Sequence, residues 1–88
     1  MKETRREKRM PYDAELRYYF YGESGQKRYT CLAIDVSNSG LGIITETPLE
    51  FGQFLAFESL SGGFSPLNAV VQWSMPLAGK FRAGLFLF

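Results

Sequence analysis

The sequence has no histidine and a single cysteine, Cys31, among its 88 residues. Without histidine the chain lacks the commonest general base, the usual activator of serine and cysteine nucleophiles, and the usual zinc ligand. One cysteine cannot form an internal disulfide, which is typical of proteins from a reducing compartment. These absences argue against an enzyme and against a metal site, and we expect no cofactor.

Long hydrophobic runs are also missing. No stretch approaches the roughly 18 apolar residues of a membrane-spanning helix, and no apolar run follows the basic opening, as it would in a secretory signal. We therefore expect a cytoplasmic protein that does not associate with a membrane. The net charge is only +1. General DNA or RNA binding is therefore not expected, because contact with a phosphate backbone needs a broad basic face.

Aromatic residues, in contrast, make up 16% of the chain, and they favour the half-buried surface of a sheet. Apolar and polar residues alternate with a period of two in six segments, which turn-forming clusters separate. The six predicted strands are residues 14–21, 27–36, 41–45, 54–60, 68–75 and 81–88. The sequence therefore predicts a single all-β domain, built as an antiparallel barrel or sandwich.

The same alternation predicts which side chains face the interior. In chain order they are Ala14, Leu16, Tyr18 and Phe20; Leu32, Ile34 and Val36; Ala69, Val71, Trp73 and Met75; and Phe81, Ala83, Leu85 and Leu87. Trp73 could stack on a base, but its place in this alternation favours the core. Cys31 is expected to be a small packing residue. Phe86 and Phe88 are expected on the outer face of the last strand, where two such rings usually need a cover.

Two short motifs carry the polar chemistry. The first is Arg5-x-x-x-Arg9, within residues 1–12, which we expect to form an extended or mobile basic arm. The second is Asp35-x-Ser37-x-x-Gly40, at the end of the second predicted strand. Each motif alone has a plain interpretation. The arm could be a solubilising tail, and Asp, Ser, Asn and Gly are the residues that ordinary turns prefer.

Taken together, in this order and spacing, the motifs resemble those of the PilZ family of cyclic di-GMP receptors. The resemblance extends to Arg9-Met10-Pro11-Tyr12 before the first strand, to Pro48-Leu49 with Gly52, and to Val71-Gln72-Trp73 with residues 81–86 in the last hairpin. The C-terminal helix of many family members has no counterpart here. The resemblance implies a six-stranded antiparallel PilZ-type β-barrel over residues 13–88, preceded by the arm at residues 1–12.

The residue types suit cyclic di-GMP, which the resemblance implies as the ligand. A guanidinium pairs with phosphate, reads the guanine edge and stacks on a base. The Asp35 carboxylate can accept from guanine N1–H and N2–H₂, and the alternation places Asp35 and Ser37 on one outward face. The predicted binding residues are Arg5, Arg9, Asp35, Ser37 and Gly40, with Thr4, Arg6 and Asn38 as additional candidates.

The expected mode of action is a clamp. Ligand phosphates draw the arm over the barrel, and a downstream protein effector reads the changed path of the arm. In the family, the residue before R-x-x-x-R influences whether one ligand or a stacked pair binds; here it is Thr4, which leaves the stoichiometry open. The protein is expected to be a monomer or a weak dimer. The alternative is a PilZ-like domain that works through protein contact and does not bind the nucleotide.

Overall fold

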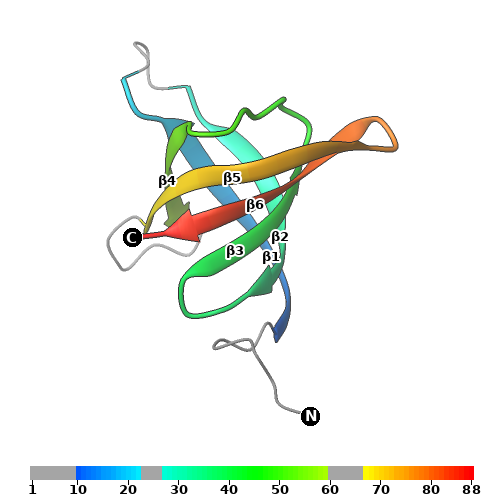
Figure 1. Cartoon of the computed structure of the whole chain (residues 1–88), viewed down its shortest axis with the longest axis horizontal. Coiled ribbons are helices and arrows are strands. Elements are labelled where there is room, and N and C mark those ends of the chain that lie inside the picture. Colours follow the sequence, from blue (N-terminus) through cyan, green and yellow to red (C-terminus); the bar gives the residue numbers. More distant parts are fainter. Residues whose placement is uncertain (1–9, 23–26, 60–66) are drawn as a thin grey trace.

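The computed structural model describes residues 10–22, 27–59 and 67–88, and this part of the chain is all β (Figure 1). The six strands are β1 (Met10–Phe20), β2 (Tyr29–Val36), β3 (Gly40–Thr45), β4 (Phe54–Ser59), β5 (Leu67–Leu77) and β6 (Lys80–Leu87). Each corresponds to one predicted strand. None of the described residues belongs to a helix that is long and apolar enough to cross a membrane.

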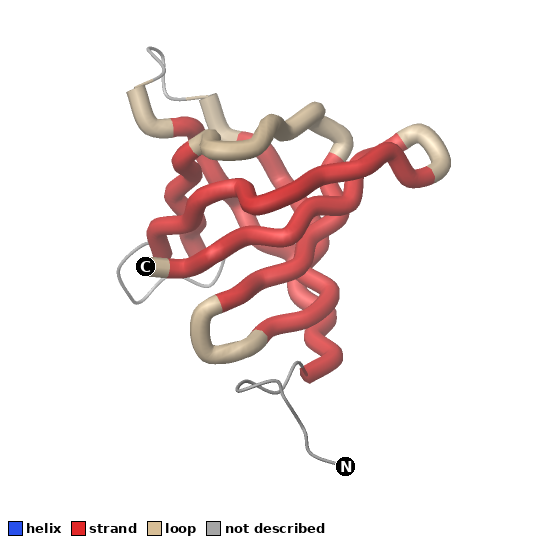
Figure 2. The backbone as a smooth tube through the Cα atoms, viewed as in Figure 1, coloured by secondary structure: helices blue, strands red, loops and turns tan. Residues whose placement is uncertain are grey.

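The strands close into a barrel in the order β1-β2-β3-β6-β5-β4, and every neighbouring pair is antiparallel. The predicted fold class is therefore confirmed. Closure gives every described strand a neighbour on both sides. The short β4 pairs only with Leu16–Phe20 of β1 and with Leu67–Val70 of β5. Figure 2 shows the β5–β6 hairpin projecting beyond the body of the barrel.

Alternation fills the interior as predicted on β1 and β6. Tyr18 is fully buried, and its ring stacks on Tyr29 with 5.5 Å between centroids. The Tyr18 hydroxyl shares a 2.8 Å hydrogen bond with the Thr45 hydroxyl, which offsets the cost of burying both groups. The fully buried side chains of Ile43, Leu55 and Val71 come from three other strands. One core therefore joins the strands around the barrel.

A β-bulge in β2 overturns part of the predicted pattern. The pairing of β2 with β3 shifts between Ala33 and Asp35. Before the shift, Cys31 and Ala33 are buried, whereas Leu32, predicted to face inward, is 41% exposed. The extra residue reverses the alternation, so Val36 packs against the core after all. The packing role predicted for Cys31 is confirmed.

A second bulge in β5 corrects the prediction for Trp73. Ala69 and Val71 are fully buried, as predicted, but the pairing with β6 shifts between Val71 and Trp73. Beyond this shift Trp73 and Met75 face outward and are 44% and 49% exposed. The prediction that both belong to the core was therefore wrong, because a strict period of two cannot reveal an inserted residue.

Candidate ligand-binding face on the outside of the barrel

The Asp35-to-Gly40 motif spans the end of β2 and the turn into β3. Asp35 lies opposite Pro11 of β1 on one side and Gly42 of β3 on the other. The Ser37 amide donates to the Gly40 carbonyl oxygen at 2.9 Å, which closes the turn. Ser37 is half-buried and Asn38 is exposed. The structure thus brings Asp35, Ser37 and Gly40 together at one corner of the barrel.

The same turn is fastened to the last strand. Gly40 is buried and lies opposite Phe86 of β6. The carbonyl oxygen of the preceding residue, Ser39, accepts a 2.8 Å hydrogen bond from the Leu87 amide. Among the described residues, the glycines with positive φ are Gly22, Gly52 and Gly79. Gly40 is not one of them. A positive φ is therefore not what requires a glycine at this position.

Gly42 allows the Asp35 carboxylate to lie against β3. A Cβ atom at position 42 would stand 2.7 Å from Asp35 Oδ1, closer than real contacts allow. The Asp35 side chain is 21% exposed, and its Oδ2 lies 3.9 Å from Arg82 Nη2. A partly exposed pair at this separation contributes at most about 1 kcal/mol to stability. Its consequence is geometric: the carboxylate is held in place with part of its surface open to solvent.

Gly84 likewise allows the Trp73 indole to lie against the sheet, here on β6. A Cβ atom at position 84 would stand 2.3 Å from the indole Nε1, so the ring lies over the bare backbone of β6. By strand register, Asp35, Gly42, Gly84 and Trp73 form one row across β2, β3, β6 and β5. One face of the indole packs on the sheet, and the exposed remainder of the ring is turned to solvent. The row therefore carries a carboxylate at one end and an aromatic plane at the other.

The N-terminal segment joins the barrel beside this row. Met10, the first residue of β1, pairs with Val36, and Pro11 pairs with Asp35. Residues 10–12, assigned to the arm from sequence, are thus part of β1. The predicted ligand residues of the arm lie outside the described residues; they are Thr4, Arg5, Arg6 and Arg9.

Sequence reasoning missed Gly42, Arg82 and Gly84, and for Trp73 it favoured a core position over base stacking. Glycine inside a strand often marks a site of close approach, and both glycines occupy outward positions of predicted strands. Gly42 and Gly84 therefore indicate a close approach at these positions from the sequence alone. The position of Trp73 depends on the β5 bulge, for which the sequence offers no comparable sign.

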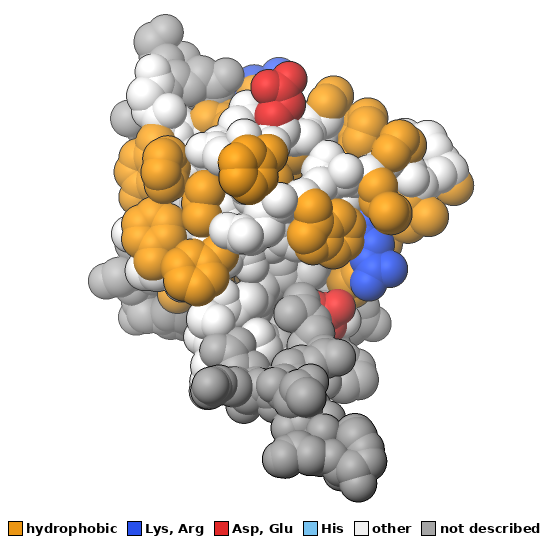
Figure 3. Space-filling model, viewed as in Figure 1, with side chains coloured by type: hydrophobic (Ala, Val, Ile, Leu, Met, Phe, Trp, Pro, Cys, Tyr) orange, Lys and Arg blue, Asp and Glu red, His pale blue; other side chains and the backbone are white. Residues whose placement is uncertain are grey.

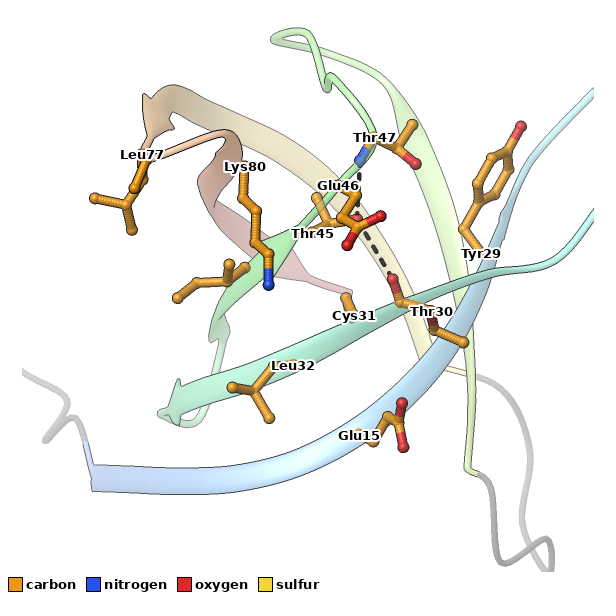
Figure 4. Close-up of a pocket in the computed structure, with 12 residues that line it drawn as sticks. Glu15, Tyr29, Thr30, Cys31, Leu32, Thr45, Glu46, Thr47, Leu77 and Lys80 are labelled. Carbon is orange, nitrogen blue, oxygen red and sulfur yellow. Dashed lines mark hydrogen bonds between the residues drawn. The ribbon is translucent and has the colours of Figure 1, made fainter.

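A separate groove lies between the outer surface of β2 and β3 and the tip of the β5–β6 hairpin (Figure 4). It has a volume of about 780 Å³ and includes the apolar side chains of Leu32, Ile44 and Leu77. Glu15 and Glu46 also line it, opposed by a single lysine, Lys80. Two carboxylates against one ammonium group disfavour a ligand with two phosphates. The groove is therefore a poorer site for a cyclic dinucleotide than the row that contains Asp35.

The closed barrel therefore carries the polar motif turn and the exposed Trp73 indole on its outer surface. The family model of the PilZ domain matches residues 3–85, nearly the whole chain, and the chain therefore belongs to the PilZ domain family. Domains of this family are binding and signalling modules, and the family is that of the cyclic di-GMP receptors. No curated protein matches the chain in sequence.

Proposed function

We propose that this domain binds cyclic di-GMP on the outer face of the barrel, with Arg5 and Arg9 of the arm and the Asp35-to-Gly40 motif as its main contacts. The observation that carries the proposal is the pairing of Pro11 with Asp35. It joins the strand that follows the arginine motif directly to the strand that carries the second motif. Because β1 begins at the residue after Arg9, this pairing supports a site that both motifs share, although Arg9 and Asp35 are 26 residues apart in the sequence.

The row supplies complementary chemistry for a guanine. The Asp35 carboxylate accepts hydrogen bonds from guanine N1–H and N2–H₂, while its seat on Gly42 limits the rotamer freedom lost on binding. At the other end, the exposed face of Trp73 offers a stacking surface for a base. Arg82, next to Asp35, adds a fixed positive charge for a phosphate or for the guanine O6 edge.

The arm supplies the remaining charge. Residues 1–10 contain five basic and two acidic side chains. Bidentate contacts from Arg5 and Arg9 to the ligand phosphates hold the arm against the barrel, and its new path is the signal passed to a protein effector. The ligand acts here as a bridge between the arm and the motif turn.

A calorimetric titration tests the proposal. Wild-type protein is expected to bind cyclic di-GMP with micromolar or tighter affinity and to bind GMP and GTP little. Arg9→Ala should weaken binding about 10- to 150-fold, the equivalent of about 1.5–3 kcal/mol for a charge-assisted contact. Lys8→Ala is the matched control, and its effect should be much smaller. Equal losses at positions 8 and 9 would show that the arm acts through net charge alone.

Asp35→Ala separates a binding role from a structural one. The variant should lose most of its affinity for cyclic di-GMP while its melting temperature changes little, because the partly exposed ion pair with Arg82 contributes little stability. Thermal unfolding is measured beside the titration. A collapse of the melting temperature would instead identify Asp35 as a structural residue of the turn.

A second candidate function is protein contact without a nucleotide. It is favoured by Phe86 and Phe88, which are 44% and 62% exposed on the outer face of the barrel. The two functions separate in the same experiment, since a flat titration of folded protein at high cyclic di-GMP concentration would favour the second.

A further inference from the structure

An aromatic surface without charged side chains among the described residues that form it covers the outside of the barrel near the end of β6. It consists of Tyr21, Phe54, Val70, Phe86 and Phe88, and we refer to it as the aromatic face. Strand register places Phe54 beside Val70 and Val70 beside Phe86, and the rings of Phe54 and Phe88 meet edge to face at 5.9 Å. The four aromatic side chains are between 44% and 62% exposed. Figure 3 shows hydrophobic side chains gathered on this side of the molecule.

The surroundings of the aromatic face carry little charge. The outward neighbours on β1, β4 and β5 are Tyr19, Ala56, Asn68 and Gln72. The Tyr21 hydroxyl donates to Asn68 Oδ1, so one polar pair is already satisfied within the face. Beyond Tyr19 lies Arg28, whose guanidinium stacks on the Tyr19 ring and pairs with Glu58. A partner could therefore cover the aromatic face without desolvating an unpaired charge.

We propose that the aromatic face docks on the same face of a second copy of this chain. An extended peptide cannot add to the sheet here, because each described strand is already paired on both sides. The described side chains of the aromatic face offer a charged partner no complementary charge. A second copy presents the same uncharged aromatic surface, and a two-fold axis brings the face onto itself as an isologous interface.

The area of the face sets the strength of this association. Four aromatic side chains of about 150–250 Å² each, about half exposed, leave roughly 400 Å² for contact. This is about half of the roughly 800 Å² that each partner contributes to a standard stable interface. The face is therefore small for a stable interface, and we expect a weak dimer that forms only at high protein concentration.

Sedimentation velocity on the 88-residue chain without nucleotide tests this proposal over about 10 μM to about 1 mM. The sedimentation coefficient of the wild type should rise with concentration from monomer towards dimer. Phe86→Asp places a like charge from each copy in the interface and should abolish the rise. Leu32→Asp is the matched control, since Leu32 is 41% exposed on β2, which β3 separates from the β6 strand that carries Phe86. It should behave as the wild type does.

A second variant keeps the proposal testable if Phe86→Asp does not fold. Phe88→Ser removes a side chain that is 62% exposed and should raise the dissociation constant about tenfold or more at an unchanged melting temperature. A wild type that stays monomeric at about 1 mM would overturn the proposal, and so would equal effects at positions 32 and 86. Because no nucleotide is present, the result does not depend on whether the domain binds cyclic di-GMP.

Discussion

At the scale of single residues, two glycines determine what can lie on the outer surface of β3 and β6. Gly42 and Gly84 pair with each other, and each is covered by a flat group from the next strand, the Asp35 carboxylate or the Trp73 indole. Any larger residue at either position would lift the group that covers it. The positions of the Asp35 and Trp73 side chains on the outer face therefore depend on the absence of a Cβ atom at positions 42 and 84.

Gly84→Ala tests this arrangement. The new Cβ would stand 2.3 Å from Trp73 Nε1, so the indole must leave its seat. Trp73 is the single tryptophan of the chain, so its fluorescence emission should shift to longer wavelength as the ring enters solvent. If the indole stacks on the ligand, affinity for cyclic di-GMP should fall by about tenfold. Met75→Ala changes an outward side chain of β5, the strand that carries Trp73. It should leave the emission spectrum and the affinity for cyclic di-GMP nearly unchanged. An unaltered emission spectrum in Gly84→Ala would contradict the proposed seat.

Cys31 gives a prediction that concerns pH. Burial raises the pKa of its thiol to about 12, whereas an unfolded thiol ionises near about 8.5. The folded protein therefore keeps a proton that the unfolded chain loses, and stability should decline as pH rises from about 8.5 towards 12, by up to about 1.4 kcal/mol per pH unit. Reaction with a thiol reagent at pH 8 should be slow in native protein and fast in urea. Rapid labelling of native protein would show that Cys31 is not buried.

At the scale of the strands, the sequence predicted all six elements and the inward faces of β1 and β6. It did not predict the irregular pairing between Pro11 and Ala14 of β1, nor the bulges in β2 and β5. In β2 and β5 one inserted residue reverses the alternation, which exposes Leu32 in one strand and Trp73 in the other. The side chains on either side of a bulge obey the same period of two, so apolar patterning alone cannot reveal the shift. The candidate site was accordingly predicted at Asp35, Ser37 and Gly40, but not at its aromatic end.

The motif turn and the last strand should respond to ligand as a unit. The Leu87 amide donates to the Ser39 carbonyl oxygen at 2.8 Å, so a ligand that holds the turn should reduce opening of this bond. Hydrogen exchange of the Leu87 amide should slow on addition of cyclic di-GMP. The Val71 amide, which donates to the Gln53 carbonyl oxygen at 2.9 Å, serves as the control and should not change. Equal slowing at both amides would indicate general stabilisation rather than a contact at the turn.

At the scale of the whole molecule, the barrel carries three surfaces with different chemistry. The row from Asp35 to Trp73 crosses β2, β3, β6 and β5 beside the point where the arm joins. The aromatic face lies nearer the end of β6. The separate groove lies between β2, β3 and the tip of the β5–β6 hairpin. The row and the aromatic face adjoin, because Gly40 of the motif turn pairs with Phe86 of the aromatic face, so a nucleotide and a protein bound at the two proposed sites would be close neighbours.

The most direct measurement of the central claim is a map of amide and indole chemical shifts on addition of cyclic di-GMP. The account predicts that the largest changes fall on the motif turn at Asp35 and Ser37, on Gly42, and on the Trp73 indole N–H. Residues of the separate groove, such as Leu32 and Leu77, should change little. Changes centred on that groove, or no changes at saturating nucleotide, would contradict the account.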